Sequence, residues 1–119
     1  MGIFDEILGT LSSSLGVGRM SLADATKNAP NSMGCYQIFL NGSLKYVGKA
    51  EDGLRKRFVQ YYNGTTAHYP SAQMILAFKD KISVAWVVCN SREQCRQLEA
   101  KWIREKKPEW NAQSGWGGY

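Results

Sequence analysis

The acidic residue Glu99 occupies an unexpected position in the sequence. The segment from Ser91 to about Lys107 has helical periodicity, and Glu99 falls in the middle of its apolar stripe. The apolar members of this stripe are Cys95, Leu98, Trp102 and Ile103. A carboxylate on a core-facing stripe is costly unless it is paired or bound to a cation. Two interpretations follow: a salt bridge to a neighbouring Arg or Lys, or a ligand for a metal ion.

Other polar side chains precede and follow this acid at defined intervals. The elements, in order, are Gly34-Cys35-Tyr36, Tyr46-Val47-Gly48-Lys49, Arg57, Glu99 and Asn111. Taken singly, tyrosines on strands are most often core residues, and Lys and Arg are ordinarily solvated. The joint order and spacing, rather than any one of these residues, indicates a function.

These elements resemble the GIY-YIG nuclease superfamily over about residues 34 to 112. Lys49 directly after Tyr-Val-Gly, and Tyr61 four residues after Arg57, are most similar to the N-terminal incision domain of bacterial nucleotide-excision nuclease. The resemblance implies an endonuclease that hydrolyses DNA phosphodiester bonds with one divalent metal ion. The implied cofactor is Mg²⁺ or Mn²⁺, and the implied partner is DNA.

The resemblance also implies catalytic roles for particular side chains: Tyr36, Tyr46, Lys49, Arg57, Tyr61 and Glu99. Tyr36 would be the general base toward the attacking water. Because a free phenol has a pKa of about 10, a neighbouring ammonium such as Lys49 would have to favour its phenolate. Tyr46 and Tyr61 would hydrogen-bond the phosphate or the water.

The same resemblance makes Glu99 the metal ligand. One carboxylate suffices, because Mg²⁺ and Mn²⁺ keep several waters and complete their shell with phosphate oxygens. The metal and Arg57 would then stabilise the charge that grows on the phosphoryl and leaving oxygens.

Four more residues are candidates for contacts around the substrate: His68, Arg55, Asn111 and Lys101. His68 lies in a loop and could contact phosphate or simply face solvent. Asn111 would support the site structurally. Lys101, with the basic residues Arg104, Lys106 and Lys107, could line a DNA track or only solvate the last helix.

Two features depart from the family pattern. Cys35 stands where the family usually has a branched aliphatic residue, a conservative change because free cysteine packs as a small hydrophobe. Gly53 adds one residue between Tyr46 and Arg57. The register of the arginine could therefore shift, and Arg55 is the alternative to Arg57.

The pattern of the whole chain predicts the elements that position these residues. Helices are expected over about 22–28, 53–62, 70–79 and 91–107, and strands over 35–40, 44–49 and 82–89. Asn41-Gly42 predicts a hairpin. We expect a three-residue loop with a bulge at Gly42 or Ser43, which pairs Leu40 with Leu44 and puts Tyr36 and Tyr46 on one sheet face. Strand 82–89 is apolar at nearly every position, so both its faces should be buried.

These elements predict an α+β fold, with a small, about three-stranded antiparallel sheet flanked by helices. The expected division is an N-terminal helical extension over 1–33, a GIY-YIG nuclease domain over 34–112 and a flexible Gly/aromatic tail over 113–119. Residues 3–15 have the pattern of an amphipathic helix, which could dock on the domain's own core or contact a second copy or a partner protein.

Composition sets limits on these interpretations. With 119 residues and a net charge of +5, the chain has room for one domain and suits a polyanionic partner. The three cysteines lack C-x-x-C spacing, so the sequence indicates neither a disulfide framework nor a zinc site. Without an apolar run long enough for a membrane span or a basic signal-peptide start, we expect a soluble, cytoplasmic protein.

Two alternatives to the nuclease stay open. The first is a non-catalytic DNA-binding or partner-binding module that retains the GIY-YIG fold. The second is a small structural α+β protein that resembles the family by chance. A joint set of Tyr36, Tyr46, Lys49, Arg57 and Glu99 disfavours the first, because binding alone does not need a carboxylate on an apolar face.

Overall fold

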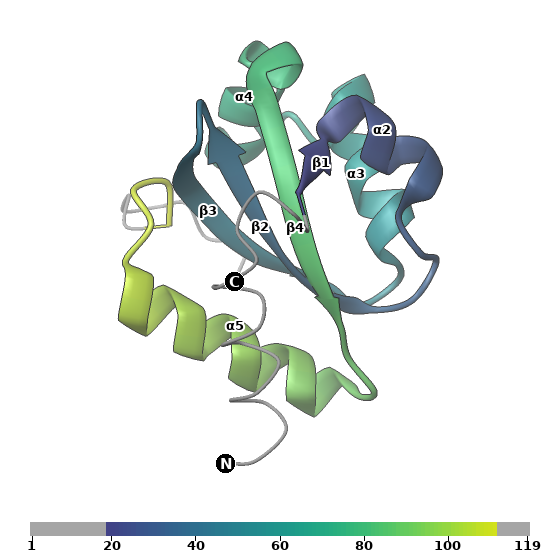
Figure 1. Cartoon of the computed structure of the whole chain (residues 1–119), viewed down its shortest axis with the longest axis vertical. Helices are drawn as coiled ribbons and strands as arrows, with labels where there is room; N and C mark the ends of the chain where they lie inside the picture. The colour runs from purple at the N-terminus through teal and green to yellow at the C-terminus, as the bar shows by residue number, and fades with distance from the viewer. Residues whose placement is uncertain (1–18, 112–119) are drawn as a thin grey trace.

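The computed structural model describes residues 19–111 (Figure 1). Its elements, in chain order, are β1 (Met20–Ser21), α2 (Leu22–Asn28), β2 (Gly34–Leu40), β3 (Ser43–Ala50), α3 (Leu54–Asn63), α4 (Pro70–Ala77), the short 3₁₀ helix η1 (Lys79–Lys81), β4 (Ile82–Val88) and α5 (Arg92–Lys106). The expected helix over 3–15 and the expected tail over 113–119 lie outside the described residues. The division of the chain into three parts therefore stays a prediction.

One antiparallel sheet organises the fold. Its strand order is β1-β4-β2-β3, and each neighbouring pair is antiparallel. The α+β class is confirmed, but the sheet has four strands rather than about three. The additional strand, β1, has only two residues and pairs Met20 with Val84 and Ser21 with Ser83, so it carries no alternating pattern that sequence could show.

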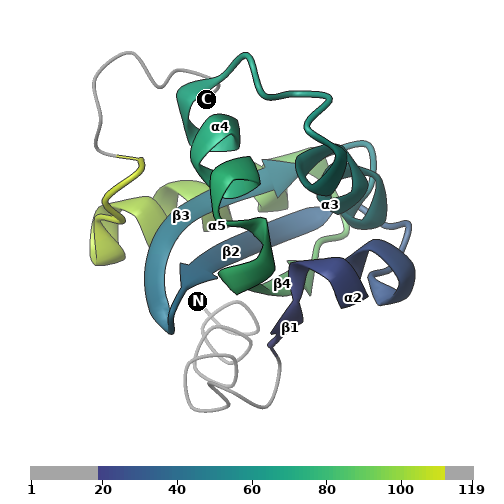
Figure 2. The same cartoon turned by 90° about the horizontal axis from the view of Figure 1, so that it is seen from above.

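Helices cover both faces of the sheet. Helix α5 packs on one face, and α2, α3 and α4 lie on the other (Figures 1 and 2). Each face has its own apolar cluster, one built around Tyr36, Ile38 and Phe58 and the other around Val47, Leu98 and Trp102. The central strand β4 is buried on both faces over most of its length, as predicted, and only its last residue, Val88, is largely exposed.

The hairpin between β2 and β3 differs from the predicted one. Leu40 pairs with Ser43, so the loop is the two-residue turn Asn41-Gly42, in which both residues have positive φ. This is the conformation that Asn-Gly favours in tight hairpins. The irregularity in register lies at Lys45, since Ile38 pairs with Tyr46 and Phe39 with Leu44. The predicted loop length, bulge position and Leu40–Leu44 pairing are therefore wrong.

The predicted consequence of that hairpin nevertheless holds. A two-residue loop alone would put Tyr36 and Tyr46 on opposite faces. The extra residue at Lys45 restores the parity, so both tyrosines belong to the same apolar cluster, with ring centroids 6.4 Å apart. Two changes to the predicted geometry thus cancel.

Local signals explain the ends of the helices. Ser21 and Ser91 cap α2 and α5, because their hydroxyls accept hydrogen bonds from the backbone N–H groups of Asp24 and Gln94. Helix α3 begins after Gly53, and the preceding segment supplies carbonyls to its first N–H groups: Leu54 donates to Ser32, and Arg55 to Pro30. Within residues 19–111, none of the helices is long and apolar enough to cross a lipid bilayer.

Candidate active site

A solvent-open pocket of about 350 Å³ lies beside strand β3. Its lining residues are Tyr36, Tyr46, Lys49, Glu51, Asp52, Arg57, Arg92 and Glu99. Five of the six side chains predicted to be catalytic therefore converge on one cavity, although they come from β2, β3, α3 and α5. Chemistry at this place can use a phenol, a guanidinium, an ammonium and a carboxylate together.

Tyr36 reaches the pocket because the neighbouring strand has no side chain in its path. Tyr36 on β2 is paired with Gly48 on β3. A Cβ atom added at Gly48 would lie 2.5 Å from the Tyr36 hydroxyl oxygen and 2.6 Å from Cζ. The ring therefore lies across β3 at Gly48, and its hydroxyl meets groups from α3.

A buried hydrogen-bond group surrounds the Tyr36 hydroxyl. The hydroxyl of Tyr61, on α3, lies 2.5 Å away. Arg57 Nη1 donates to the Tyr36 hydroxyl at 3.4 Å and to the Lys49 carbonyl at 3.2 Å. The extra residue at Gly53 thus leaves Arg57 facing the pocket, and the fallback Arg55 instead donates to the Ala29 carbonyl at 2.7 Å.

The electrostatics of Tyr36 correct one expectation. Burial and the adjacent Tyr61 raise the pKa of Tyr36 well above the ordinary value of 10.0. The cation that opposes this rise is Arg57, not Lys49 as we expected. Lys49 instead pairs with Glu51 at 3.2 Å, and its charge only partly offsets the rise that burial causes in the pKa of Glu99. Sequence order placed Lys49 near the tyrosine but could not show which cation would contact the hydroxyl.

Glu99 fits a cation ligand rather than a member of a salt bridge. Its side chain is only 7% exposed, yet it lines the open pocket. Among residues 19–111, no group donates a hydrogen bond to its carboxylate or forms an ion pair with it. Burial raises the pKa of Glu99, and Lys49 partly opposes this rise. An unpartnered, nearly buried carboxylate that faces solvent-filled space is the donor type that Mg²⁺ and Mn²⁺ prefer.

Sequence reasoning missed three charged residues of the pocket, namely Glu51, Asp52 and Arg92. Each is held by ion pairs that join separate elements: Glu51 contacts Arg92 as well as Lys49, and Asp52 contacts Lys56 and Arg57. These pairs hold the loop after β3 against α3 and the start of α5. The available signal was the position of Glu51 and Asp52 directly after the Tyr-Val-Gly-Lys-Ala stretch.

A second pocket, of about 360 Å³, continues from the first. Tyr46, Asp52 and Arg57 line both cavities, whereas Tyr61 and His68 line only the second. The ring of His68 lies against that of its neighbour Tyr69, with centroids 4.1 Å apart and the planes tilted by 41°. His68 is therefore close to the site but not part of its polar centre.

The last two predicted residues lie on the α5 side. Lys101 pairs with Glu105 at 2.8 Å and is not among the residues that line either pocket. Asn111 is buried and binds both backbone groups of Val47: its Oδ1 accepts the N–H at 2.8 Å and its Nδ2 donates to the carbonyl at 2.9 Å. The structural role implied for Asn111 has a clear geometric basis.

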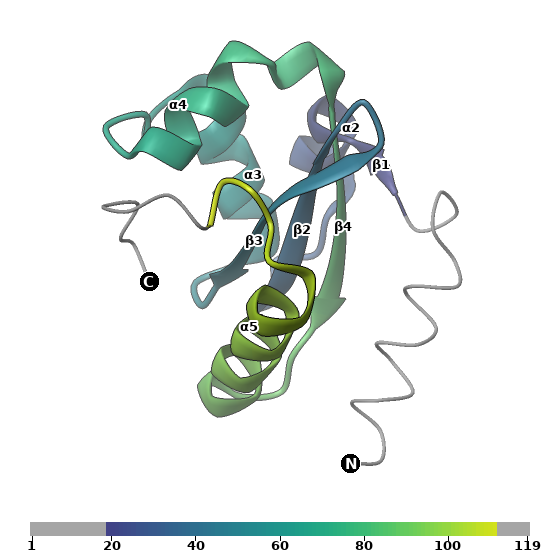
Figure 3. The same cartoon turned by 90° about the vertical axis from the view of Figure 1, so that its left-hand side faces the viewer.

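Contacts with Trp110, Asn111 and Arg57 occupy the outer edge of β3. The segment after α5 runs along β3 (Figure 3), and Trp110 N–H donates to the Lys45 carbonyl at 2.8 Å. Trp110, Asn111 and Arg57 thus occupy the outward groups of Lys45, Val47 and Lys49 in turn. These contacts occupy backbone groups that an edge strand would otherwise leave open for pairing with another chain. This edge supports Tyr46 and Gly48 at the pocket.

Comparison with known proteins supports the same assignment. The family model of the UvrC-like GIY-YIG domain matches residues 32–112. UvrABC system protein C of Thermobifida fusca is 32% identical over 94 residues, which cover 78% of this chain and 14% of that protein. The corresponding protein of Helicobacter pylori G27 is 31% identical over 96 residues, covering 76% of this chain and 16% of that protein. The chain thus spans about a seventh of the length of these relatives.

Solved structures show the same fold. The GIY-YIG N-terminal endonuclease domain of UvrC from Thermotoga maritima, bound to its catalytic magnesium, has a TM-score of 0.62 and 24% identity, covering 76% of this chain and 96% of that one. A point mutant of EndoII from bacteriophage T4 has a TM-score of 0.54 and 18% identity, covering 87% and 96%. The resemblance seen in the sequence is confirmed, and the chain belongs to the family of UvrC-like GIY-YIG domains.

Proposed function

We propose that this chain is a divalent-metal-dependent nuclease that hydrolyses DNA phosphodiester bonds. The observation that carries the proposal is the convergence of the Tyr36 hydroxyl, the Arg57 guanidinium and the unpartnered Glu99 carboxylate on one solvent-open pocket. Simple DNA binding requires cations, but it does not require a nearly buried carboxylate directed at the phosphate. The net charge of +5 suits a polyanionic substrate.

In this proposal Glu99 holds one Mg²⁺ or Mn²⁺ ion, which supplies Lewis-acid stabilisation of the phosphoryl oxygens when bound. The magnesium-bound Thermotoga maritima domain supports this choice of cation. Arg57 stabilises negative charge on the transferred group from the side of α3. Tyr46, which lines both cavities, positions the phosphate or the attacking water.

Tyr36 acts as the general base toward water. Its hydroxyl is held by the Tyr61 hydroxyl and by Arg57, so its orientation is fixed before the substrate arrives. Burial keeps the phenol neutral in the free protein, because its pKa lies well above 10. The chain's own contribution to forming the phenolate is the Arg57 contact, since a cation beside the hydroxyl favours the ionised form. We infer that Tyr61 shares the proton through the hydroxyl–hydroxyl contact.

The relatives are components of a UvrABC system, and we propose that DNA damaged in some way is among the substrates of this chain.

Association with a second copy or a protein partner through residues 3–15 also stays a proposal. It can be examined by comparing the oligomeric state of the full chain with that of a chain that starts at residue 19.

Plasmid nicking tests the proposed activity. The full chain is incubated with supercoiled plasmid and Mg²⁺ or Mn²⁺, and with excess chelator as a blank. We expect Glu99→Gln and Tyr36→Phe each to reduce the nicking rate by about 10²-fold or more, because each removes a group that acts in the transition state. Glu93→Gln, on the exposed start of the same helix, and Tyr62→Phe, on α3 outside the pocket, are the matched controls and should retain activity.

Each result decides between the functions considered. Equal nicking by wild type and both site variants would remove the catalytic assignment, because the activity would then come from elsewhere. Absence of nicking by folded wild type, together with salt-sensitive retardation of DNA, would favour the non-catalytic binding module.

A further inference from the structure

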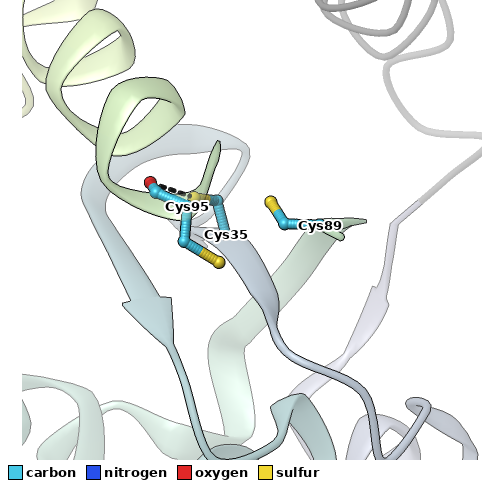
Figure 4. A group of neighbouring side chains, drawn as sticks. All are labelled: Cys35, Cys89 and Cys95. Atoms are coloured by element: carbon cyan, nitrogen blue, oxygen red, sulfur yellow. Dashed lines mark hydrogen bonds between the residues drawn. The ribbon is translucent and has the colours of Figure 1, made fainter. Parts of the chain in front are cut away.

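The three cysteines of the chain meet in space. The Sγ atoms of Cys35, Cys89 and Cys95 all lie within 4.8 Å of one another, and all three side chains are buried. Figure 4 shows that they come from three different places in the fold: β2, the residue directly after β4 and the first turns of α5. The Cys35 thiol donates to the Cys95 carbonyl at 3.0 Å.

The sheet register explains how Cys35 and Cys89 become neighbours. Cys35 is paired with Val87 across β2 and β4, so these two side chains share a face. Cys89 is two residues after Val87 and continues the ladder by donating its N–H to the Met33 carbonyl at 3.0 Å. It therefore lies on the same face, diagonal to Cys35. Helix α5 covers this face and brings in Cys95.

The surroundings of the thiols are apolar. The same buried cluster contains Val47, Val87, Leu98 and Trp102, with Met33 packed against it. Cys35 and Cys95 are fully buried, and Cys89 is nearly so. Three separate thiols in contact give a packed core no advantage over three small aliphatic groups. Three convergent soft donors, however, are the ligand set that thiophilic d¹⁰ ions select.

We propose that Cys35, Cys89 and Cys95 form a binding site for one thiophilic metal ion of the Zn²⁺ or Cu⁺ class. Binding replaces each S–H bond by a metal–sulfur bond and releases the thiol protons to solvent, so no oxidant or reductant is needed. A zinc–sulfur bond is about 2.3 Å long, which puts three sulfurs about 4.0 Å apart around one ion. The side chains therefore need only a small inward rotation from their present positions.

This site differs from the Glu99 site in chemistry and in place. Glu99 offers a hard carboxylate oxygen to a solvent-open pocket, whereas the thiols offer soft sulfur within the core. The two are nevertheless joined through the chain: Cys35 precedes Tyr36 on β2, and Cys95 lies one helical turn before Glu99 on α5. An ion held by the thiols would cross-link β2, the end of β4 and α5, which carry or adjoin residues of the pocket. Metal binding by the thiols does not depend on the nuclease proposal.

Titration of the reduced full chain with Cd²⁺, as a spectroscopic probe for Zn²⁺, tests the proposal. We expect one ion per chain and a sulfur-to-metal charge-transfer band in the ultraviolet. In Cys89→Ser the band per bound ion should fall by about one third, because one of three thiolates is lost, and the affinity should fall about tenfold or more. Val88→Ser is the matched control, since Val88 is the exposed neighbour at the same strand end. Its titration should match wild type.

Two further measurements keep the test decisive if Cys89→Ser does not fold. One equivalent of Zn²⁺ or of Cu⁺ should raise the thermal midpoint of the wild-type chain and protect its thiols from alkylation, because the ion binds the folded state. Glu99→Gln should show the same rise, since it keeps all three thiols. Alkylation without metal shows whether all three thiols are free. If they are free and the chain still binds no ion, the proposal is overturned. It is also overturned if two of the cysteines form a disulfide and the chain, once that disulfide is reduced, binds no ion. Unchanged Cd²⁺ binding by Cys89→Ser would also overturn it.

Discussion

Burial of the Glu99 carboxylate has opposite effects on folding and on metal affinity. Burial disfavours the charged form of the side chain relative to the neutral form, and the pKa of Glu99 is therefore raised. Once ionised, the carboxylate has no hydrogen-bond or ion-pair partner among residues 19–111. A divalent cation supplies the missing partner. The residue that costs the apo protein stability is thus the residue that we assign to the metal.

We expect Glu99→Gln to be more stable than wild type at pH 7 without metal. Below its ordinary pKa of 4.5 the carboxyl is protonated in both the folded and the unfolded state. As pH rises above that value, the unfolded state loses its proton first, so the free energy of unfolding of wild type falls until the folded pKa is passed. Glutamine does not ionise, so the free energy of unfolding of Glu99→Gln does not fall in this way as pH rises. Thermal denaturation in chelator should therefore show equal midpoints near pH 4 and a higher midpoint for Glu99→Gln at pH 7.

Addition of Mg²⁺ provides the control for this prediction. Wild type should gain stability as the ion binds the folded state, and Glu99→Gln should gain little. A lower midpoint for Glu99→Gln at pH 7 in chelator would mean that the carboxylate has a stabilising partner and would contradict our account.

Sequence was a good guide to which residues matter and a poorer guide to how they contact one another. The positions of Tyr36, Tyr46, Arg57 and Glu99 on one pocket follow from spacing and resemblance. The choice of Arg57 over Lys49 as the cation beside Tyr36 depends on the side-chain path from α3, which sequence does not encode locally.

At the scale of elements, the β2–β3 hairpin shows why local patterns predicted the site better than the turn. Alternation constrains which face a side chain occupies, but an extra residue can be placed in the loop or within the strand with the same result. The structure places it at Lys45, inside β3. The Asn41-Gly42 turn is then free to adopt its preferred two-residue form. The shared face of the tyrosines was predictable, and the loop length was not.

Two glycines of this hairpin should respond differently to alanine. Gly48→Ala puts a Cβ within 2.5 Å of the Tyr36 hydroxyl, so the ring must leave its place over β3. We expect loss of nicking activity by about 10²-fold or more, with a destabilisation of about 1–3 kcal/mol from overpacking. Urea denaturation and plasmid nicking measure the two effects.

Gly42→Ala is the matched control for this substitution. Apart from its two chain neighbours, no atom of residues 19–111 lies within 4 Å of the added Cβ, but the φ of +85° is strained for alanine. It should cost about 1 kcal/mol of stability and leave activity nearly unchanged. Equal activity of Gly48→Ala and Gly42→Ala would show that the position of the Tyr36 ring does not matter for cleavage.

At the scale of the whole molecule, the cysteine cluster marks the limit of reading one sequence. Cys35, Cys89 and Cys95 have no metal-binding spacing, because metal motifs visible in sequence place two ligands in one loop. Here each thiol comes from a different element, and the cluster exists only once β2, β4 and α5 have packed. The same holds for Glu51 and Arg92, whose ion pair joins the loop after β3 to the start of α5. Long-range juxtaposition of this kind needs the fold.

The distribution of charge yields a prediction about DNA binding by the whole chain. The end of α5 carries the exposed cations Arg104 and Lys106, which follow Glu99 along the same helix. If these residues contact phosphates, replacing both by glutamine makes the negative slope of log affinity against log salt concentration shallower by about 1.8 units, since each phosphate contact contributes about −0.9. Retardation of a short duplex, measured in Ca²⁺ with the Glu99→Gln background to prevent cleavage, gives this slope.

A double substitution of the same charge on another part of the surface separates local contacts from the effect of net charge. Lys27 on α2 and Lys81 in η1 are exposed and lie on elements that do not line either pocket. Lys27→Gln with Lys81→Gln should reduce the slope by much less than Arg104→Gln with Lys106→Gln, because counterions are released only where phosphate is contacted. Equal slopes for the two double variants would mean that α5 does not carry a DNA track. In that case Arg104 and Lys106 solvate the end of the helix and do not contact phosphates.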